Sequence, residues 1–387
     1  RGNAMKNFIF TSESVSEGHP DKICDQISDA ILDAYLKEDP MSRTAIETVV
    51  TPRRIFIFGE IKSSLPLKRE HLDQIVRERI REIGYEKPPF DWRTVAIEID
   101  LKTQSPDIAQ GIEEDHGAGD QGIMFGYASR ENEMLMPTPL YFAQTLLRHL
   151  AEDRKRGLLS QLGPDAKCQF SVRYYDHKPV GTTAIVVSSQ HLEGLNSEDV
   201  KALIWPYVEK ILPHGWFCGD ESFFVNPTGR FVIGGPESDT GLTGRKIIVD
   251  TYGGMAPHGG GAFSGKDPTK VDRSAAYMAR YMAKNVVASG LAERCTIQLS
   301  YAIGRADPTS FYINTHGTGL IPEDRLATVL RELLDLTPQG IRIKLNLNRP
   351  IYTRTAAYGH FGREVDFDGG FSWEKIDLVE ELECAFL

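Results

Sequence analysis

A short segment near the N-terminus combines a glycine, an imidazole and charged side chains in a pattern that suits phosphate. Residues 17–22 read Glu-Gly-His-Pro-Asp-Lys and are followed by apolar residues at helical spacing. Pro20 fits the first position of a helix, which places His19 and Asp21 at the helix N-terminus, where free N–H groups attract phosphate. An aspartate beside such a site is a natural Mg²⁺ ligand. The alternative is that both side chains only cap the helix.

A second segment is rich in glycine and spans residues 253–267. Read from Gly260, it nearly matches the P-loop pattern GxxxxGK[ST], but Asp267 replaces the hydroxyl that binds magnesium. We predict a strand before it, at residues 246–251, and a helix after it, at residues 271–289. The pattern indicates a phosphate-binding loop. The mismatch disfavours a P-loop ATPase or kinase, which is the alternative function.

Three cations stand close together at the end of this loop: Lys266, Lys270 and Arg273. They alternate with Asp267 and Asp272, and this mixture of charges suits a metal–polyphosphate complex better than a structural turn. A flexible glycine hinge is the alternative interpretation of the segment.

Three weaker signals lie elsewhere in the chain. Arg245 and Lys246 are adjacent, next to the predicted buried strand, and are poor candidates for a solvated surface. Arg230 and Phe231 offer a charge and a ring face to a nucleotide, although such a pair is more often strand surface and core. Asp120, within a glycine-rich hexapeptide, has the charge to hold an ammonium group.

The elements that position these residues follow from hydrophobic periodicity. Helical spacing predicts helices at residues 68–84, 138–157, 197–212, 322–336 and 372–386, with a cap for the third at Ser197. Alternation and β-branched residues predict strands at residues 44–50, 53–61, 94–102, 169–175, 182–188 and 296–303. This interleaving favours an α+β fold of open sheets with helices on one face. Residues 103–122 lack periodicity, which is typical of a functional or disordered loop.

The composition is that of a globular protein. The chain has 387 residues, enough for two or three domains, and a net charge of −10 without a long basic run. That charge argues against nucleic-acid and anionic-membrane partners. No stretch approaches the roughly 18 apolar residues of a membrane span, and no secretory signal is recognisable. Five cysteines without a CxxC pair indicate reduced thiols, so we expect a cytoplasmic protein.

Four segments together resemble the S-adenosylmethionine synthetase (methionine adenosyltransferase) family, and most of all its bacterial branch. They are residues 10–22, 117–122, 250–254 and 259–272. The resemblance extends over nearly the whole chain. It implies three similar αβ domains, with mixed or antiparallel sheets covered by helices, about a pseudo-threefold axis. The implied boundaries are residues 5–105, 123–235 and 236–387, with a mobile active-site gate at residues 106–122.

The resemblance also implies an activity and a set of site residues. Members of this family join the methionine sulfur to C5′ of ATP and then hydrolyse the triphosphate to phosphate and diphosphate. ATP would contact His19, Asp165, Lys167, Arg230, Phe231, Asp239, Arg245, Lys246, Ala262 and Lys266. Of these, the expected catalytic residues are His19, Lys167, Arg245, Lys246 and Lys266. Methionine would contact Glu60, Gln104, Asp120, Asp239 and Lys270.

Metal ions and a second subunit complete the site that the resemblance implies. Asp21 and Asp272 would each hold one of two Mg²⁺ ions, and Glu47 would hold one K⁺. Two subunits of a homodimer would pack through their sheets and share the active sites, and two dimers would form a homotetramer.

The chemistry of this reaction accounts for the set of residues. A thioether sulfur has no proton to lose, so no general base is required. The departing triphosphate gathers negative charge, and each cation aimed at it can supply about 3 kcal/mol. Mg²⁺ adds Lewis-acid stabilisation, and alignment of sulfur with C5′ supplies orientation. A catalytically inactive regulatory subunit is a further alternative, disfavoured because His19, Lys167 and Lys266 are all present.

Overall fold

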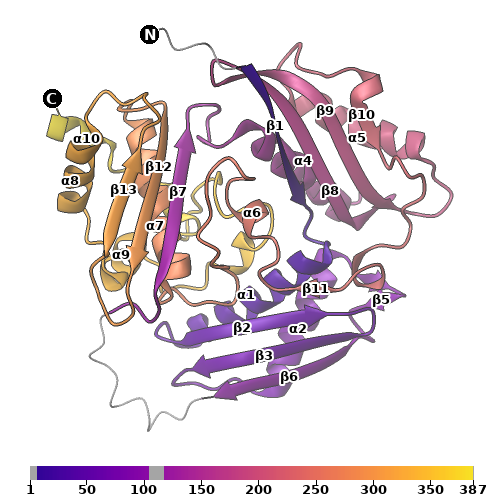
Figure 1. Ribbon diagram of the computed structural model, residues 1–387. Helices are drawn as coiled ribbons and strands as arrows, with labels where there is room; N and C mark the ends of the chain where they lie inside the picture. The colour runs from indigo at the N-terminus through magenta and orange to yellow at the C-terminus, as the bar shows by residue number, and fades with distance from the viewer. Residues whose placement is uncertain (1–6, 104–116, 387) are drawn as a thin grey trace.

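The computed structural model describes residues 7–103 and 117–386 of the chain (Figure 1). Most of the predicted gate, residues 106–122, lies outside these ranges, and so does the predicted methionine contact Gln104. Within them, no helix combines the length and the apolar character that a membrane crossing requires.

The first of three larger sheets has the strand order β1-β8-β9-β10. Its strands are β1 (Asn7–Val15), β8 (Leu162–Tyr175), β9 (Lys178–His191) and β10 (Phe223–Val225). Helices α4 (Thr138–Lys155) and α5 (Ser197–Ile211) cover one face of the sheet. Phe142 of α4 packs there against Phe170 of β8, with ring centroids 5.6 Å apart. This core fixes β8, which carries two of the predicted site residues.

The second sheet has the order β11-β2-β3-β6 and packs against α1 and α2. Its strands are β2 (Arg43–Val50), β3 (Arg54–Lys62), β6 (Ala96–Thr103) and the two-residue β11 (Gly241–Leu242). Its helices are α1 (Pro20–Glu38) and α2 (Arg69–Ile83). Burial alternates along β2, where Ile46 and Thr48 are buried and Glu47 is exposed. One face therefore packs on the helices and the other faces outward.

The third sheet is antiparallel and has the order β13-β12-β7. Its strands are β7 (Gly122–Ser129), β12 (Arg294–Tyr301) and β13 (Ser310–Asn314). Helix α7 (Val271–Ala288) packs on this sheet and is buried along most of its length. The helices that complete this unit are α8 (Glu323–Leu333), α9 (Pro338–Leu345) and α10 (Val379–Phe386). Figure 1 shows the three sheets around a centre that contains the short helix α6 (Ile247–Asp250).

Each large sheet takes one strand from a distant part of the chain. β1 pairs with β8, β11 with β2 and β7 with β12, in each case antiparallel. The chain therefore crosses between the three αβ units, and the domain boundaries given above stay a prediction. The short elements are β4 (Glu86–Lys87), β5 (Phe90–Asp91) and 3₁₀ turns at Asp220–Ser222, Gly235–Glu237, Thr353–Thr355 and Ser372–Glu374. The prediction of an α+β fold built from three αβ units is confirmed.

One predicted strand is wrong. Residues 246–251 form a turn and the single-turn helix α6, without a sheet partner. Gly244 and Gly253 on either side adopt φ values of +79° and +62°, which turn the chain out of any extended path. The apolar run Ile-Ile-Val has the residue types of a strand, but periodicity alone cannot separate a short buried helix from a strand.

Two other local predictions need smaller corrections. Helix α5 is capped by Asn196, whose side chain accepts the N–H of Asp199 at 3.0 Å in a capping box, and Ser197 is its first residue. The predicted helix at residues 372–386 is a 3₁₀ turn followed by α10. The predicted hairpin at residues 44–61 is confirmed as β2 and β3.

Candidate active site

Helix α1 begins where the sequence predicts, with His19 as its N-cap. The Nδ1 atom of His19 accepts the backbone N–H of Asp21 at 3.1 Å. Burial, with a further contribution from Lys246, lowers the pKa of His19 to about 3. The imidazole is therefore neutral at physiological pH. Because Nδ1 is an acceptor, the proton of the neutral ring lies on Nε2, which can donate to a ligand oxygen.

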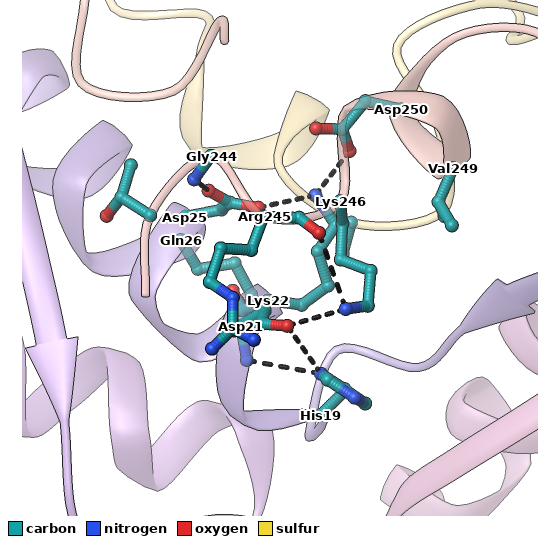
Figure 2. Close-up of polar contacts among 12 residues, drawn as sticks. His19, Asp21, Lys22, Asp25, Gln26, Gly244, Arg245, Lys246, Val249 and Asp250 are labelled. Atoms are coloured by element: carbon teal, nitrogen blue, oxygen red, sulfur yellow. Dashed lines mark hydrogen bonds and ion pairs between the residues drawn. The ribbon is translucent and has the colours of Figure 1, made fainter. Parts of the chain in front are cut away.

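Two cations more than 200 residues further along the chain contact Asp21 (Figure 2). The Nζ atom of Lys246 lies 2.5 Å from one carboxylate oxygen, and the guanidinium of Arg245 lies 3.8 Å from the other. Asp21 also accepts the backbone N–H of Leu242 at 3.0 Å. Burial alone would raise the pKa of Asp21, but these bonds from Lys246 and Leu242 lower it below its ordinary value. The carboxylate is thus ionised and paired.

Strand β8 brings Asp165 and Lys167 to the same region. Lys167 pairs in register with Val15, the last residue of β1, and its charge acts on His19. Asp165 is buried and accepts the backbone N–H of Gly235 at 2.7 Å. Burial raises the pKa of Asp165 to about 6, and the nearby charge of Asp239 acts in the same direction. Seven of the predicted site residues are therefore neighbours: His19, Asp21, Asp165, Lys167, Asp239, Arg245 and Lys246.

The predicted adenosine contacts are only partly brought together. Gln190 links Asp165 to the segment after Phe231, since it accepts the Asp165 N–H and donates to the Val232 carbonyl, both at 3.2 Å. The Arg230 guanidinium instead binds the Glu193 carboxylate at 2.6 Å, and both side chains are largely exposed.

The glycine-rich loop adds a second pair of opposite charges. Lys266 Nζ lies 2.7 Å from a carboxylate oxygen of Asp272. Gly261 leaves room for this carboxylate, because a Cβ there would lie 2.5 Å from it. A Cβ on Gly244 would likewise lie 2.8 Å from that of Ala262, so the loop touches the segment that carries Lys246.

The other two loop cations, Arg273 and Lys270, also bind aspartates of the protein. Arg273 is fully buried and forms two hydrogen bonds with Asp29 of α1, at 2.7 and 2.9 Å. It lies on the face of α7 that packs inward, so it is a structural ion pair and not a phosphate contact. Lys270 binds the buried Asp267 at 2.5 Å in this structure. The loop also follows no strand, which removes the context that a P-loop requires.

The other predicted methionine and potassium residues lie on open surface. Glu47 of β2 and Glu60 of β3 project from the exposed face of the second sheet, where Glu47 is close enough to feel the charge of Lys266. Asp120 is exposed and accepts the N–H of Gln121 at 2.7 Å. Within residues 7–103 and 117–386, no hydrogen bond or ion pair links Glu47, Glu60 or Asp120 to His19 or Asp21.

A buried polar network, which the sequence analysis did not predict, lies next to His19 and Asp21. Lys22 binds Asp25 at 2.9 Å and forms a short bond with Asp250 (Figure 2). Asp25 and the Asp29 carboxylate also accept backbone N–H groups of the two loops that carry the predicted phosphate contacts. The sequence contained a signal for this network, because aspartates recur every four residues along the helix.

The chain was compared with known proteins. Sequence models of the N-terminal, central and C-terminal domains of S-adenosylmethionine synthetase match residues 7–106, 115–231 and 233–375. The S-adenosylmethionine synthase of Paramagnetospirillum magneticum is 59% identical and aligns over 99% of this chain and 100% of its own length. S-adenosylmethionine synthase 2 of Rhodospirillum rubrum is also 59% identical, over 99% of both chains. The chain therefore belongs to the S-adenosylmethionine synthetase family.

Proposed function

We propose that this chain is a methionine adenosyltransferase that makes S-adenosylmethionine from ATP and L-methionine. The sulfur of methionine attacks C5′ of ATP, and triphosphate leaves and is hydrolysed to phosphate and diphosphate. Membership of the family supports this activity over the full length of the chain. The observation that carries the proposal is the neutral, buried His19 beside Asp21, Lys167 and Lys246.

The cations of the site are suited to a leaving group that gains negative charge. Lys246 and Lys266 are each held against a carboxylate, so both ammonium groups are already ordered. Phosphate oxygens would replace the carboxylates as their partners. His19 would donate a hydrogen bond from Nε2 to an oxygen near the breaking C5′–O bond, and its ring would remain neutral. No residue has to remove a proton from the thioether.

Asp21 and Asp272 are the proposed Mg²⁺ ligands. Both offer carboxylate oxygens, the donors that Mg²⁺ prefers; Asp21 is now paired with Lys246 and Arg245, and Asp272 with Lys266. Within the described part of the chain, no three His, Cys, Asp or Glu side chains gather as a cage for a metal. That fits Mg²⁺, which is usually held by one or two carboxylates together with water and substrate phosphates. A bound Mg²⁺ would supply Lewis-acid stabilisation of the leaving group.

The remaining contacts are proposed to need a second subunit. Glu47, for K⁺, and Glu60, for methionine, lie on an outward sheet face with the exposed ring of Phe58. Exposed apolar side chains of this kind favour packing against another protein surface. We place the other methionine contacts at Gln104, Asp120, Asp239 and Lys270. A homodimer, paired further into a homotetramer in the cytoplasm, is the proposed assembly.

One assay tests the activity. The purified protein is incubated with ATP, methionine, Mg²⁺ and K⁺, and S-adenosylmethionine, phosphate, diphosphate and ADP are measured together. We expect S-adenosylmethionine with phosphate and diphosphate and no ADP. Release of ADP would identify an ATPase or kinase, and folded protein without any product would identify an inactive subunit. Either result would refute the proposal.

A further inference from the structure

Four aspartates lie on one face of helix α1 because they are spaced four residues apart. Each carboxylate accepts a backbone N–H from a distant part of the chain, and Asp21 and Asp25 hold the same segment, residues 242–244. The pairs are Asp21 with Leu242 at 3.0 Å, Asp25 with Gly244 at 2.9 Å, Asp29 with Gly265 at 2.9 Å and Asp33 with Tyr352 at 2.9 Å. This row, which we call the aspartate ladder, fastens loops to the helix.

The two middle members hold the chain directly before the predicted phosphate contacts. Gly244 precedes Arg245 and Lys246, and Gly265 precedes Lys266. Both glycines have positive φ, +79° and +84°, so the chain turns sharply at the residue whose N–H the carboxylate accepts. The position of the N–H group therefore fixes where the next side chain starts.

The carboxylates of Asp25 and Asp29 are themselves held rigidly. Both are fully buried. Lys22 binds Asp25 at 2.9 Å, and Arg273 binds Asp29 through two hydrogen bonds. A buried acceptor fixed by a charged partner has no alternative orientation that keeps its hydrogen bonds. Helix α1 therefore fixes the positions of the backbone at Gly244 and Gly265.

We infer that Asp25 and Asp29 are positioning residues. By accepting the N–H groups of Gly244 and Gly265, they fix the positions of the cations that are proposed to bind phosphate. Neither carboxylate needs to touch the substrate. The inference rests on the proposed function, because it takes Lys246 and Lys266 as ligands of the triphosphate. It predicts that Asp25 and Asp29 control affinity for the leaving group and not for methionine.

Asp25 offers the sharper test, since Lys22 keeps Asp250 as a partner when Asp25 is removed. The probe is tripolyphosphate with Mg²⁺, and its affinity is measured by calorimetry. For Asp25→Ala we expect affinity and kcat each to fall about tenfold, with the KM for methionine changed about twofold at most. Asp25→Asn still offers an oxygen to the Gly244 N–H, whereas its NH2 group replaces the oxygen that Lys22 contacts. Because Lys22 keeps Asp250 as an acceptor, we expect affinity within about threefold of the wild type.

The matched control is Asp33→Ala, because Asp33 is the ladder member whose loop carries none of the predicted phosphate contacts. We expect a lower Tm and unchanged affinity for tripolyphosphate. Asp25→Leu fills the vacated volume and replaces the alanine variant if that variant is too unstable to measure.

Wild-type affinity in Asp25→Ala would overturn the inference, and so would an asparagine variant as weak as the alanine variant, since charge alone would then be responsible. A wild-type protein that makes no S-adenosylmethionine refutes the proposed function instead. The comparison of tripolyphosphate affinities can be made in either case, so the two failures are distinguishable.

Discussion

The Nζ atom of Lys246 lies 2.5 Å from a carboxylate oxygen of Asp21, although 225 residues separate them in the chain. The same arrangement recurs between Lys266 and Asp272, at 2.7 Å. In both pairs a cation suited to phosphate neutralises a carboxylate suited to Mg²⁺. A magnesium–triphosphate complex has both charges, so it can replace each internal bond with a stronger pair of bonds to ligand.

Removing the charge of Asp21 should weaken the response to magnesium. For Asp21→Asn we expect the Mg²⁺ concentration that gives half-maximal activity to rise at least about tenfold, because an amide oxygen is a poorer ligand than a carboxylate. A magnesium titration of S-adenosylmethionine formation measures this. Asp33→Asn, on the same helix, is the control and should leave the titration unchanged. An unchanged titration in Asp21→Asn would show that Asp21 is not a metal ligand.

Lys266→Ala should reduce turnover far more than stability. Its ammonium is a quarter exposed and binds one carboxylate, so its loss should change the Tm little, whereas kcat should fall about 100-fold or more. Lys201→Ala is a matched control, since Lys201 of α5 is similarly exposed and pairs with Asp220. Steady-state kinetics and thermal unfolding are compared. Parallel losses of Tm and activity in Lys266→Ala would indicate a structural role.

Arg273 should behave as a structural residue. Arg273→Ala leaves the Asp29 charge buried without its partner, so we expect a loss of about 3–5 kcal/mol in the free energy of unfolding. Arg354→Ala removes a half-exposed arginine from Asp366 and Asp368 and should cost about 1 kcal/mol or less. Urea unfolding compares the two. Similar small losses in both variants would contradict the buried ion pair.

His360 should make the protein less stable in mild acid. Burial, reinforced by Arg273 and Lys22, lowers the pKa of His360 well below its ordinary value of 6.5. The unfolded chain then takes up a proton that the folded chain does not. The stability contributed by neutral His360 is therefore fully present above pH 6.5 and is lost as the pH falls.

Urea unfolding at about pH 7.5 and about pH 5.5 measures this contribution. We expect the difference in unfolding free energy between the wild type and His360→Gln to shrink by about 1.4 kcal/mol at the lower pH. The His360 ring is buried in the core, where its Nδ1 is hydrogen-bonded to Tyr277 at 2.7 Å, and the glutamine variant has no group that titrates in this pH range. A difference that is independent of pH would mean that folding does not shift the pKa of His360.

The sequence by itself determined the features that depend on neighbours along the chain. Pro20 and the apolar spacing after it located the start of α1 with His19 as its cap, and the hairpin of β2 and β3 followed from alternation. The glycine-rich loop and its lysine were recognisable because glycines allow positive φ and a close approach of the backbone to a ligand. Motifs of several residues in order were enough to indicate the family.

Only the tertiary structure decided which distant residues meet. It buried Arg273 against Asp29, formed α6 within residues 246–251, exchanged strands between the three sheets and joined the aspartates of α1 to three distant loops. Local periodicity reports which face of an element is apolar, whereas the partner of a charge depends on how whole elements pack. Asp21 and Lys246 are 225 residues apart, so no spacing rule could pair them.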